Sequence, residues 1–173
     1  MYRRGLLISL ASIGLAGCLA DPLPSFGESL EVDGLVATPH HYELVDAISG
    51  DSERTSHEGE PEELLVAEVS LGNESGGARR PPWPADNEVY LFNEGVENDV
   101  LPLADEFEAG GESYNSFAGA IETVGSREAI PPDREVRGAV AYRLDFPLQT
   151  DAAYFGMMLY EGDQIVSIEW QLD

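Results

Sequence analysis

The sequence predicts an all-β fold, an antiparallel β-sandwich of about 7–9 strands. Residues 136–146 and 166–172 place apolar side chains at every second position, as half-buried strands do. Residues 154–160 are apolar except for one glycine, which is typical of a central strand covered on both faces. Polar or Gly- and Pro-rich segments separate the apolar stretches, and no stretch keeps a helical period. The length suits a single domain.

In chain order, the earlier strands are expected at residues 30–37, 41–49, 64–73, 88–92 and 98–103. Residues 104–109 are expected to form one short helical turn. The segment Glu161-Gly162-Asp163 is expected to join the last two strands as a hairpin. The side chains expected to face the core are Val136, Gly138, Val140, Tyr142, Leu144 and Phe146 in one strand, and Val166, Ile168, Trp170 and Leu172 in the last.

The first 21 residues have the layout of a secretory signal that ends in a lipobox. Arg3 and Arg4 precede an apolar run over residues 5–17, which is too short to span a membrane. Small residues then precede Cys18, the one cysteine of the chain. We therefore expect a signal peptide over residues 1–17, a lipid on Cys18, a tether over residues 18–29 and the domain over residues 30–173.

This interpretation places the protein outside the cytoplasm, anchored to the cell membrane by its lipid. One acyl chain binds a membrane only marginally, so the lipid on Cys18 is expected to carry two chains. The pair Arg3-Arg4 fits a twin-arginine signal, which exports folded proteins, and we expect this route. Two arginines also suit a Sec signal, and Tyr2 replaces the usual Ser or Thr before the pair, so the Sec route stays open.

The chain is strongly acidic, with 33 Asp and Glu against 9 basic residues and a net charge of −24. All basic residues are arginines. Such charges repel one another in dilute buffer and are screened in molar salt, where the Debye length is about 3 Å. The acid-rich, lysine-free composition resembles that of extremely halophilic archaea. No nucleic acid partner is expected, because phosphate binding needs clustered basic residues, and Arg79-Arg80 are expected only to decorate a loop.

No recognisable motif points to an enzyme, and we expect no catalytic residues, no cofactor and no metal centre. The nucleophile-elbow pattern G-x-S-x-G is absent. His40 and His41 are consecutive, so on a strand they are expected to point to opposite faces and not to chelate one ion. Acidic loops such as residues 58–63 and 105–108 could supply oxygen ligands for calcium. None matches the calcium-loop pattern, and a solvated acidic surface is the favoured alternative.

Two residues are candidates for surface contacts. Asn73 opens the sequon Asn73-Glu74-Ser75, which makes it a candidate glycosylation site if it is exposed. Trp83 lies in the stiff loop 81–84, Pro-Pro-Trp-Pro, and is a candidate partner contact if it is exposed, because Trp dominates interface hot spots. The favoured alternative for Trp83 is a side chain that folds down onto the sandwich.

Several phrases of the sequence resemble the immunoglobulin-like domains of secreted bacterial and archaeal lipoproteins of unknown function. They are the strand 64–73, which ends in L-x-N, the segment Ile130-Pro131-Pro132-Asp133, and the strand end Asp145-Phe146-Pro147. Gly138 matches the small residue that this family has early in that strand, whereas Asp133 stands where glycine is common. The resemblance covers residues 30–173 and implies an immunoglobulin-like β-sandwich. The family has no catalytic motif that could be carried over.

These observations lead to a functional hypothesis. We expect a lipid-anchored cell-surface protein with a non-enzymatic binding or accessory role in the envelope. Its expected contacts are the membrane, through the lipid on Cys18, and an envelope protein, through loops or a sheet edge. The alternative is a ligand- or ion-capturing lipoprotein that delivers to a transporter, which a closed apolar pocket with converging polar groups would favour.

Overall fold

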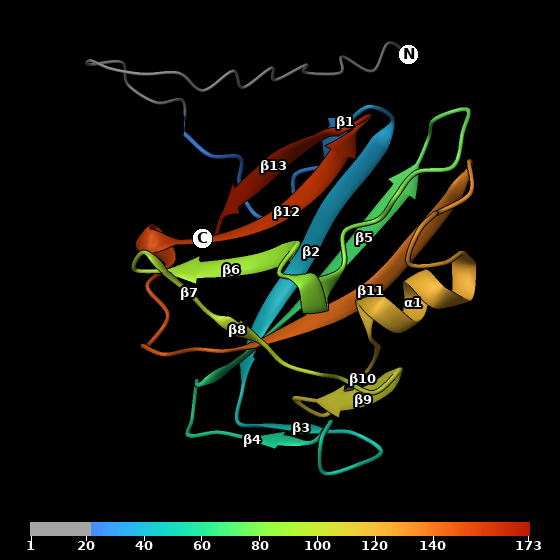
Figure 1. The fold of residues 1–173 in the computed structure, drawn as a ribbon. Coiled ribbons are helices and arrows are strands. Elements are labelled where there is room, and N and C mark those ends of the chain that lie inside the picture. Colours follow the sequence, from blue (N-terminus) through green and yellow to red (C-terminus); the bar gives the residue numbers. More distant parts are fainter. Residues whose placement is uncertain (1–21) are drawn as a thin grey trace.

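A computed structural model describes residues 22–173, which form an all-β domain with one short α-helix (Figure 1). The predicted all-β class is confirmed. The strands form three sheets, with the orders β1-β2-β5-β11-β8, β13-β12-β6-β7 and β10-β9-β3-β4. Every pair of neighbouring strands in them is antiparallel. The elements are β1 (Leu30–Val32), β2 (Leu35–Val45), β3 (Ala47–Ser49), β4 (His57–Glu58), β5 (Leu64–Asn73), η1 (Pro84–Asp86), β6 (Val89–Asn93), β7 (Val96–Glu97), β8 (Asp99–Val100), β9 (Glu106–Ala109), β10 (Glu112–Asn115), α1 (Phe117–Val124), β11 (Arg134–Arg143), η2 (Thr150–Ala152), β12 (Ala153–Glu161) and β13 (Gln164–Gln171).

The main core lies between the five-stranded sheet and the sheet of β13, β12, β6 and β7. Alternate residues of β5 and β11 point into it, as do Phe155 of β12 and Trp170 of β13. Trp170 is fully buried, and its indole N–H donates to the carbonyl of Glu28 at 2.8 Å. The predicted inward face of the last strand is confirmed for Ile168, Trp170 and Leu172. The predicted central position of the strand at residues 154–160 is also confirmed, because β12 pairs with both β13 and β6. The predicted cover on both faces is not, because Tyr154, Met158 and Tyr160 are only partly buried.

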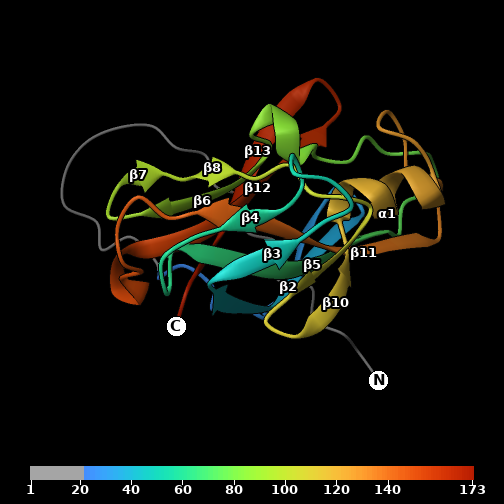
Figure 2. The same cartoon turned by 90° about the horizontal axis from the view of Figure 1, so that it is seen from below.

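A second core lies on the other face of the five-stranded sheet, where the small sheet of β10, β9, β3 and β4 covers it (Figure 2). Ala139 and Ala141 of β11 are buried there beside Val66 of β5. The prediction that residues 136–146 form a half-buried strand is therefore wrong, because the middle of β11 is covered on both faces. The strand also ends at Arg143, and Phe146 lies outside it with 49% of its surface exposed.

Residues 104–124 differ from the sequence-based expectation. The short helical turn expected at residues 104–109 is wrong, because Glu106–Ala109 form β9 and pair with β10 as a hairpin. The helix α1 follows instead, and the sequence does contain its signals. Ser116 caps it by accepting from the Gly119 N–H at 3.1 Å, and Phe117 and Ile121 are buried four residues apart.

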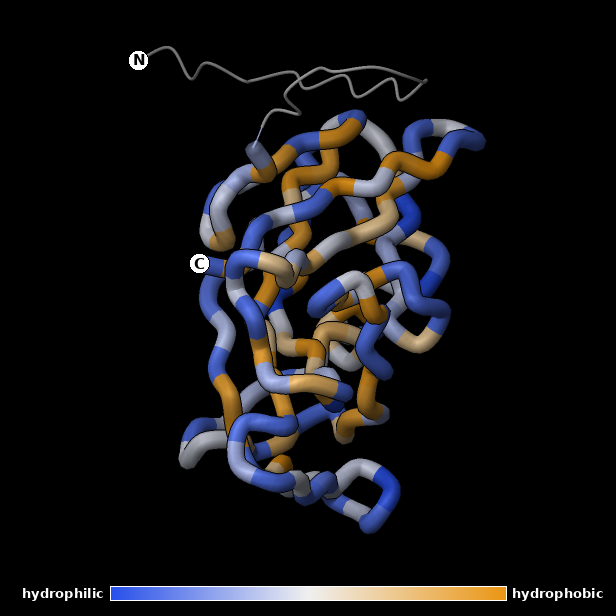
Figure 3. The backbone as a smooth tube through the Cα atoms, turned by 90° about the vertical axis from the view of Figure 1, so that its left-hand side faces the viewer, coloured by the Kyte–Doolittle hydropathy of each residue, from blue (hydrophilic) through white to orange (hydrophobic). Residues whose placement is uncertain are grey.

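Tight turns join β1 to β2 and β6 to β7. In both, the two central residues have positive φ: 47° at Asp33 and 80° at Gly34, then 53° at Glu94 and 78° at Gly95. Type I′ hairpin turns of two residues require this backbone conformation, which explains the glycine at the second position of the Asp-Gly and Glu-Gly pairs. Hydrophilic residues also gather in the loops near β3 and β4, at the lower end of the molecule in Figure 3.

A β-bulge changes where the two neighbouring histidines point. The register of β2 against β5 shifts between Pro39 and His41, so that His40 is an extra residue. The His40 Nε2 atom lies 2.9 Å from Ser70 Oγ, and His41 Nδ1 lies 3.4 Å from Glu68 Oε2. Ser70 and Glu68 are two residues apart on β5 and share one face of the sheet. The prediction that the two histidines point to opposite faces is wrong, because it assumed an unbroken strand.

The first described residues already belong to the domain. The Phe26 N–H donates to the Gln171 carbonyl at 2.9 Å, and the Gln171 N–H donates to the Pro24 carbonyl at 2.9 Å. The Phe26 ring packs edge-on against Tyr42 and Phe155. Residues 24–29, which were expected to belong to the tether, are therefore part of the domain. Cys18 and the signal peptide expected over residues 1–17 lie outside the described residues. Within residues 22–173, no helix has the length and apolar character that a membrane crossing needs.

Candidate functional site

An apolar pocket of about 320 Å³ opens beside Trp83. It lies between the two cores: Val100 in its wall packs against the main core, and Leu101 and Leu103 pack against the second. We call it the Trp83 pocket. Its lining residues are Trp83, Pro84, Ala85, Asn87, Val100, Leu101, Pro102, Leu103, Ser116, Phe117, Ala118, Ala139 and Val140.

The pocket forms where the chain leaves the edge of β11. After β8, the Leu101 N–H still donates to the Ala141 carbonyl at 2.8 Å, and Ser116 forms an isolated bridge with Ala139. Between these two contacts, residues 102–115 turn away to build the β9–β10 hairpin, and the Trp83 loop and α1 close the sides of the gap. The His57 ring donates from Nε2 to the Pro102 carbonyl at 2.7 Å and so helps to hold this wall.

A buried carboxylate holds the loop that carries Trp83. Glu88 is only 7% exposed, and it accepts from the Trp83 backbone N–H and from Arg80 Nη2, both at 2.8 Å. The Tyr160 hydroxyl also donates to Glu88, which raises the pKa of Tyr160 above its ordinary value. The Arg80 guanidinium lies over the Tyr160 ring, 4.1 Å from its centroid. Glu88 therefore ties the loop to β12 of the neighbouring sheet.

The Trp83 side chain is half-buried and is fixed on its other side by Arg127. The Arg127 guanidinium forms an ion pair with Asp86 and lies 5.2 Å from the centroid of the Trp83 ring. Trp83 also packs against the main core. The indole therefore lies down along the domain and forms a wall of the pocket, and its loop is bound on both flanks.

The start of α1 forms the opposite wall. A Cβ atom at Gly138 would lie 2.7 Å from the Phe117 Cα atom, so only glycine lets the helix start approach β11 this closely. The Ser116 N–H donates to the Asp105 carbonyl at 2.8 Å, which joins the helix start to the segment before β9. Gly138, singled out from the sequence as a small strand residue, thus positions Phe117 in the pocket wall.

The chemistry of the Trp83 pocket is that of apolar binding. Its lining has no ionisable side chain, and its polar side-chain groups belong to Asn87, Ser116 and the indole N–H of Trp83. Within residues 22–173, no group of three or more His, Cys, Asp and Glu side chains is placed to hold a metal ion. Such a surface can bury an apolar group and offer it one or two hydrogen bonds, as small-ligand and hot-spot pockets do.

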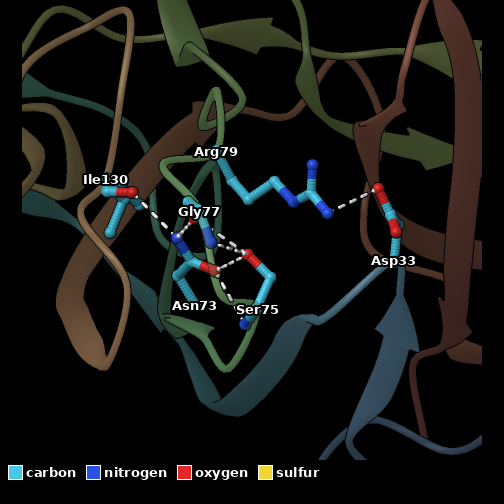
Figure 4. Close-up of polar contacts among 6 residues, drawn as sticks. All are labelled: Asp33, Asn73, Ser75, Gly77, Arg79 and Ile130. Carbon is cyan, nitrogen blue, oxygen red and sulfur yellow. Dashed lines mark hydrogen bonds and ion pairs between the residues drawn. The ribbon is translucent and has the colours of Figure 1, made fainter.

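The sequon residue Asn73 is 1% exposed and fully engaged in hydrogen bonds (Figure 4). Its Nδ2 donates to the carbonyls of Gly77 and Ile130 at 2.8 and 2.9 Å. Its Oδ1 accepts from the N–H and the hydroxyl of Ser75 at 3.0 and 2.6 Å. A glycan on Nδ2 would displace one of these donated bonds. The exposure on which the glycosylation hypothesis depended is therefore missing in the folded domain.

Arg79 and Arg80 do more than decorate a loop. Arg79 forms an ion pair with Asp33 at 2.9 Å (Figure 4), and its backbone exchanges two hydrogen bonds with Ile130. Arg80 binds Glu88, as described above. The sequence analysis missed the roles of Glu88, Arg80 and Arg127, because no local pattern shows which acids and arginines meet.

Comparisons with known proteins identify one solved structure with a similar fold and give no information on function. No protein-family model matches the chain, and no curated protein matches it. One solved structure similar to this chain is the yjhA protein from Bacillus subtilis, with a TM-score of 0.54 and 8% sequence identity. The likeness covers 87% of this chain and 100% of the other. At this identity it shows a shared fold only.

Proposed function

We propose that this chain is a non-enzymatic binding protein of the cell envelope, anchored by a lipid on Cys18, and that the Trp83 pocket is its binding site. The observation that carries the proposal is a preformed apolar pocket whose Trp83 wall is locked by the buried Glu88. A rigid pocket loses little conformational entropy on binding, so more of the free energy gained by burying an apolar group there contributes to affinity.

The proposed occupant is an apolar side chain that projects from an envelope protein. The pocket volume of about 320 Å³ lies at the lower end of the range for small-ligand sites, about 300–1,000 Å³, which suits a single bulky group. Apolar burial is also insensitive to charge screening and grows stronger with excluded salts, unlike ion pairing on a surface. It therefore suits a protein whose acidity we attribute to adaptation to high salt.

The proposal extends to the fold family and the location. We infer an immunoglobulin-like β-sandwich related to secreted lipoproteins, supported by the antiparallel sheets that enclose the main core. A short tether between Cys18 and the domain would keep the domain and its binding site close to the membrane. Since Pro24 is already fixed to β13, residues 18–23 can span at most about 20 Å. We propose export by the twin-arginine route, with the Sec route as the alternative.

A second candidate function uses the same pocket. A ligand-capturing lipoprotein that delivers to a transporter would bind a small apolar molecule between Trp83 and Phe117, with Asn87 and Ser116 as hydrogen-bonding groups. The ion-capturing form of this alternative has no comparable support within residues 22–173.

Site-specific crosslinking on intact cells in high salt tests the main proposal. A photo-crosslinking residue at Asn87, at the pocket, should capture one envelope protein. The same residue at the exposed Asp151, in η2 beyond the opposite end of β6, should not. Filling the pocket with Ala118→Phe should abolish the Asn87 crosslink. A crosslink that persists in a folded Ala118→Phe protein would contradict the proposed site. No protein crosslink, together with binding of a small apolar molecule, would favour the second function.

The anchor is tested separately by Cys18→Ser. This variant should appear in the medium instead of the membrane fraction, because it lacks the lipidated thiol. Retention of the variant in washed membranes would contradict lipid anchoring and would leave the pocket proposal untouched.

A further inference from the structure

A second, polar pocket of about 300 Å³ lies on the face of the five-stranded sheet beside β10. Figure 2 shows how β10 lies along this sheet. The sequence analysis did not assign it. Its walls are His41 of β2, Glu68 of β5 and Arg137 of β11 on one side, and Glu112, Ser113 and Asn115 of β10 on the other. We call it the His41 pocket.

Glu68 organises the sheet side of this pocket. It accepts from Arg137 Nε at 2.9 Å and from Arg137 Nη2 at 2.8 Å, and His41 Nδ1 lies 3.4 Å from its Oε2. The Glu68 side chain is 19% exposed, whereas those of Arg137 and His41 are 55% and 50% exposed. The hydrogen bonds from Arg137 lower the pKa of Glu68 below its ordinary value, so the carboxylate stays charged. The largely buried carboxylate of Glu68 thus orients the more exposed guanidinium of Arg137 and imidazole of His41.

The groups that remain free point to solvent. Arg137 Nη1 and His41 Nε2 make no hydrogen bond with any residue in the described part of the chain. The bulge in β2 is what brings His41 onto this face, and Gly138 adds no side chain to the floor. Arg137 therefore presents a donor, and His41, whose Nδ1–H faces Glu68, presents Nε2 as an acceptor. Both directions are set before any ligand arrives.

The β10 side of the pocket is also fixed. Tyr114 is buried with its ring stacked on Phe107 at a centroid distance of 5.5 Å, and its hydroxyl donates to Glu43 at 2.8 Å. This anchor holds the neighbouring Ser113 and Asn115 at the pocket. They add a hydroxyl and an amide, each able to donate and accept.

The balance of charge selects the ligand class. An anion would approach the carboxylates of Glu68 and Glu112, and a cation would approach the guanidinium of Arg137. A neutral ligand that carries many hydroxyl groups avoids both conflicts. It can accept from Arg137 and donate to His41 Nε2 and Glu112, and such short hydrogen bonds are not screened by molar salt as distant charges are.

We propose that the His41 pocket binds a neutral sugar, as a free saccharide or as one unit of a glycan. The site is separate from the Trp83 pocket, since the two share no lining residue: on β11, Gly138 lines one and its neighbour Ala139 lines the other. The protein would then have two binding surfaces, one apolar and one for hydroxyl-rich ligands.

Amide-resolved NMR titration of the folded chain in molar potassium chloride tests this proposal. The probes are the methyl α-glycosides of D-glucose, D-mannose and D-galactose, with D-glucuronate and D-glucosamine as the charged comparisons. At least one neutral glycoside should cause saturable shifts at residues 112–115 and at the Arg137 Nε–H. No saturable shift with any neutral glycoside, or tighter binding of a charged sugar, would overturn the proposal.

Matched variants make the result specific. Arg137→Gln should weaken glycoside binding about tenfold, because it removes charge-assisted donors. Arg134→Gln, at the exposed start of the same strand, should leave binding unchanged. Ser113→Phe blocks the pocket at an exposed position without touching Glu68, and it should abolish binding. Undiminished binding by folded Ser113→Phe protein would overturn the assignment to this pocket.

Discussion

Replacement of Glu88 by alanine should destabilise the domain and release the Trp83 loop. Three donors lose their acceptor: the backbone N–H of Trp83, the Tyr160 hydroxyl and the Arg80 guanidinium. The first two are part-buried, and each lost bond should cost about 1–1.5 kcal/mol. Arg80 is 47% exposed and recovers most of its loss from water, so it adds less than about 1 kcal/mol. We expect Glu88→Ala to lower the free energy of unfolding by about 3 kcal/mol.

Urea denaturation in molar potassium chloride, followed by far-UV circular dichroism, measures this change. The indole N–H signal of Trp83 should also broaden or shift, while that of the core residue Trp170 should stay in place. Glu122→Ala, at an exposed position of α1, is the matched control and should change stability by less than about 0.5 kcal/mol. If Glu88→Ala and Glu122→Ala were equally stable, the claim that Glu88 locks the pocket wall would be refuted.

Four further outcomes follow from individual contacts. Tyr142→Phe should leave stability unchanged or raise it by about 1 kcal/mol, because the buried Tyr142 hydroxyl has no partner within residues 22–173; a clear loss in urea denaturation would contradict this. Gly156→Ala should lower the free energy of unfolding by about 2 kcal/mol in the same assay, since the added Cβ would lie 2.3 Å from the Tyr90 ring. The control Gly76→Ala, which has open space around its Cβ, should cost little, and equal costs would refute the steric argument. Burial lowers the pKa of His40 below 6.5 in the folded state, so the imidazole binds a proton more readily in the unfolded chain. The stability that the neutral His40 contributes is therefore complete above pH 6.5 and is lost as the pH falls below it. His40→Gln should flatten this part of the plot of unfolding free energy against pH. Dilution from molar to about 0.1 M salt should lower the melting temperature, because the charge of −24 is then poorly screened; an unchanged melting temperature would show that the acidity is not salt adaptation.

The strands of the main core were predictable because their signal is local. In β13, Ile168, Trp170 and Leu172 are buried at every second position, which is the pattern the sequence displays. The helix α1 was missed although Ser116, Phe117 and Ile121 carry a capping residue and an apolar pair four apart. It is only eight residues long, and so short a periodic segment is easily outweighed by neighbouring loop residues.

The candidate sites were much less predictable than the fold. Trp83 was singled out by its proline-rich loop, but Glu88 is one of 33 acidic residues, and nothing local distinguishes it from the others. The His41 pocket depends on a one-residue shift between β2 and β5, which moves a side chain to the other face of the sheet. Periodicity within a single strand cannot show such a shift, since the shift is a property of the pairing.

The sequence by itself determined the all-β class, the inward residues of the last strand and the acidic surface, because these follow from composition and from periods of a few residues. It also carries the signal-like start and Cys18, on which the proposed anchor rests. Only the tertiary structure decided that β5 and β11 are covered on both faces, that Asn73 is buried, and that Glu88 joins Arg80, Trp83 and Tyr160. Tyr160 lies 72 residues from Glu88 along the chain, and a contact of that range depends on how the sheets pack and not on any local pattern.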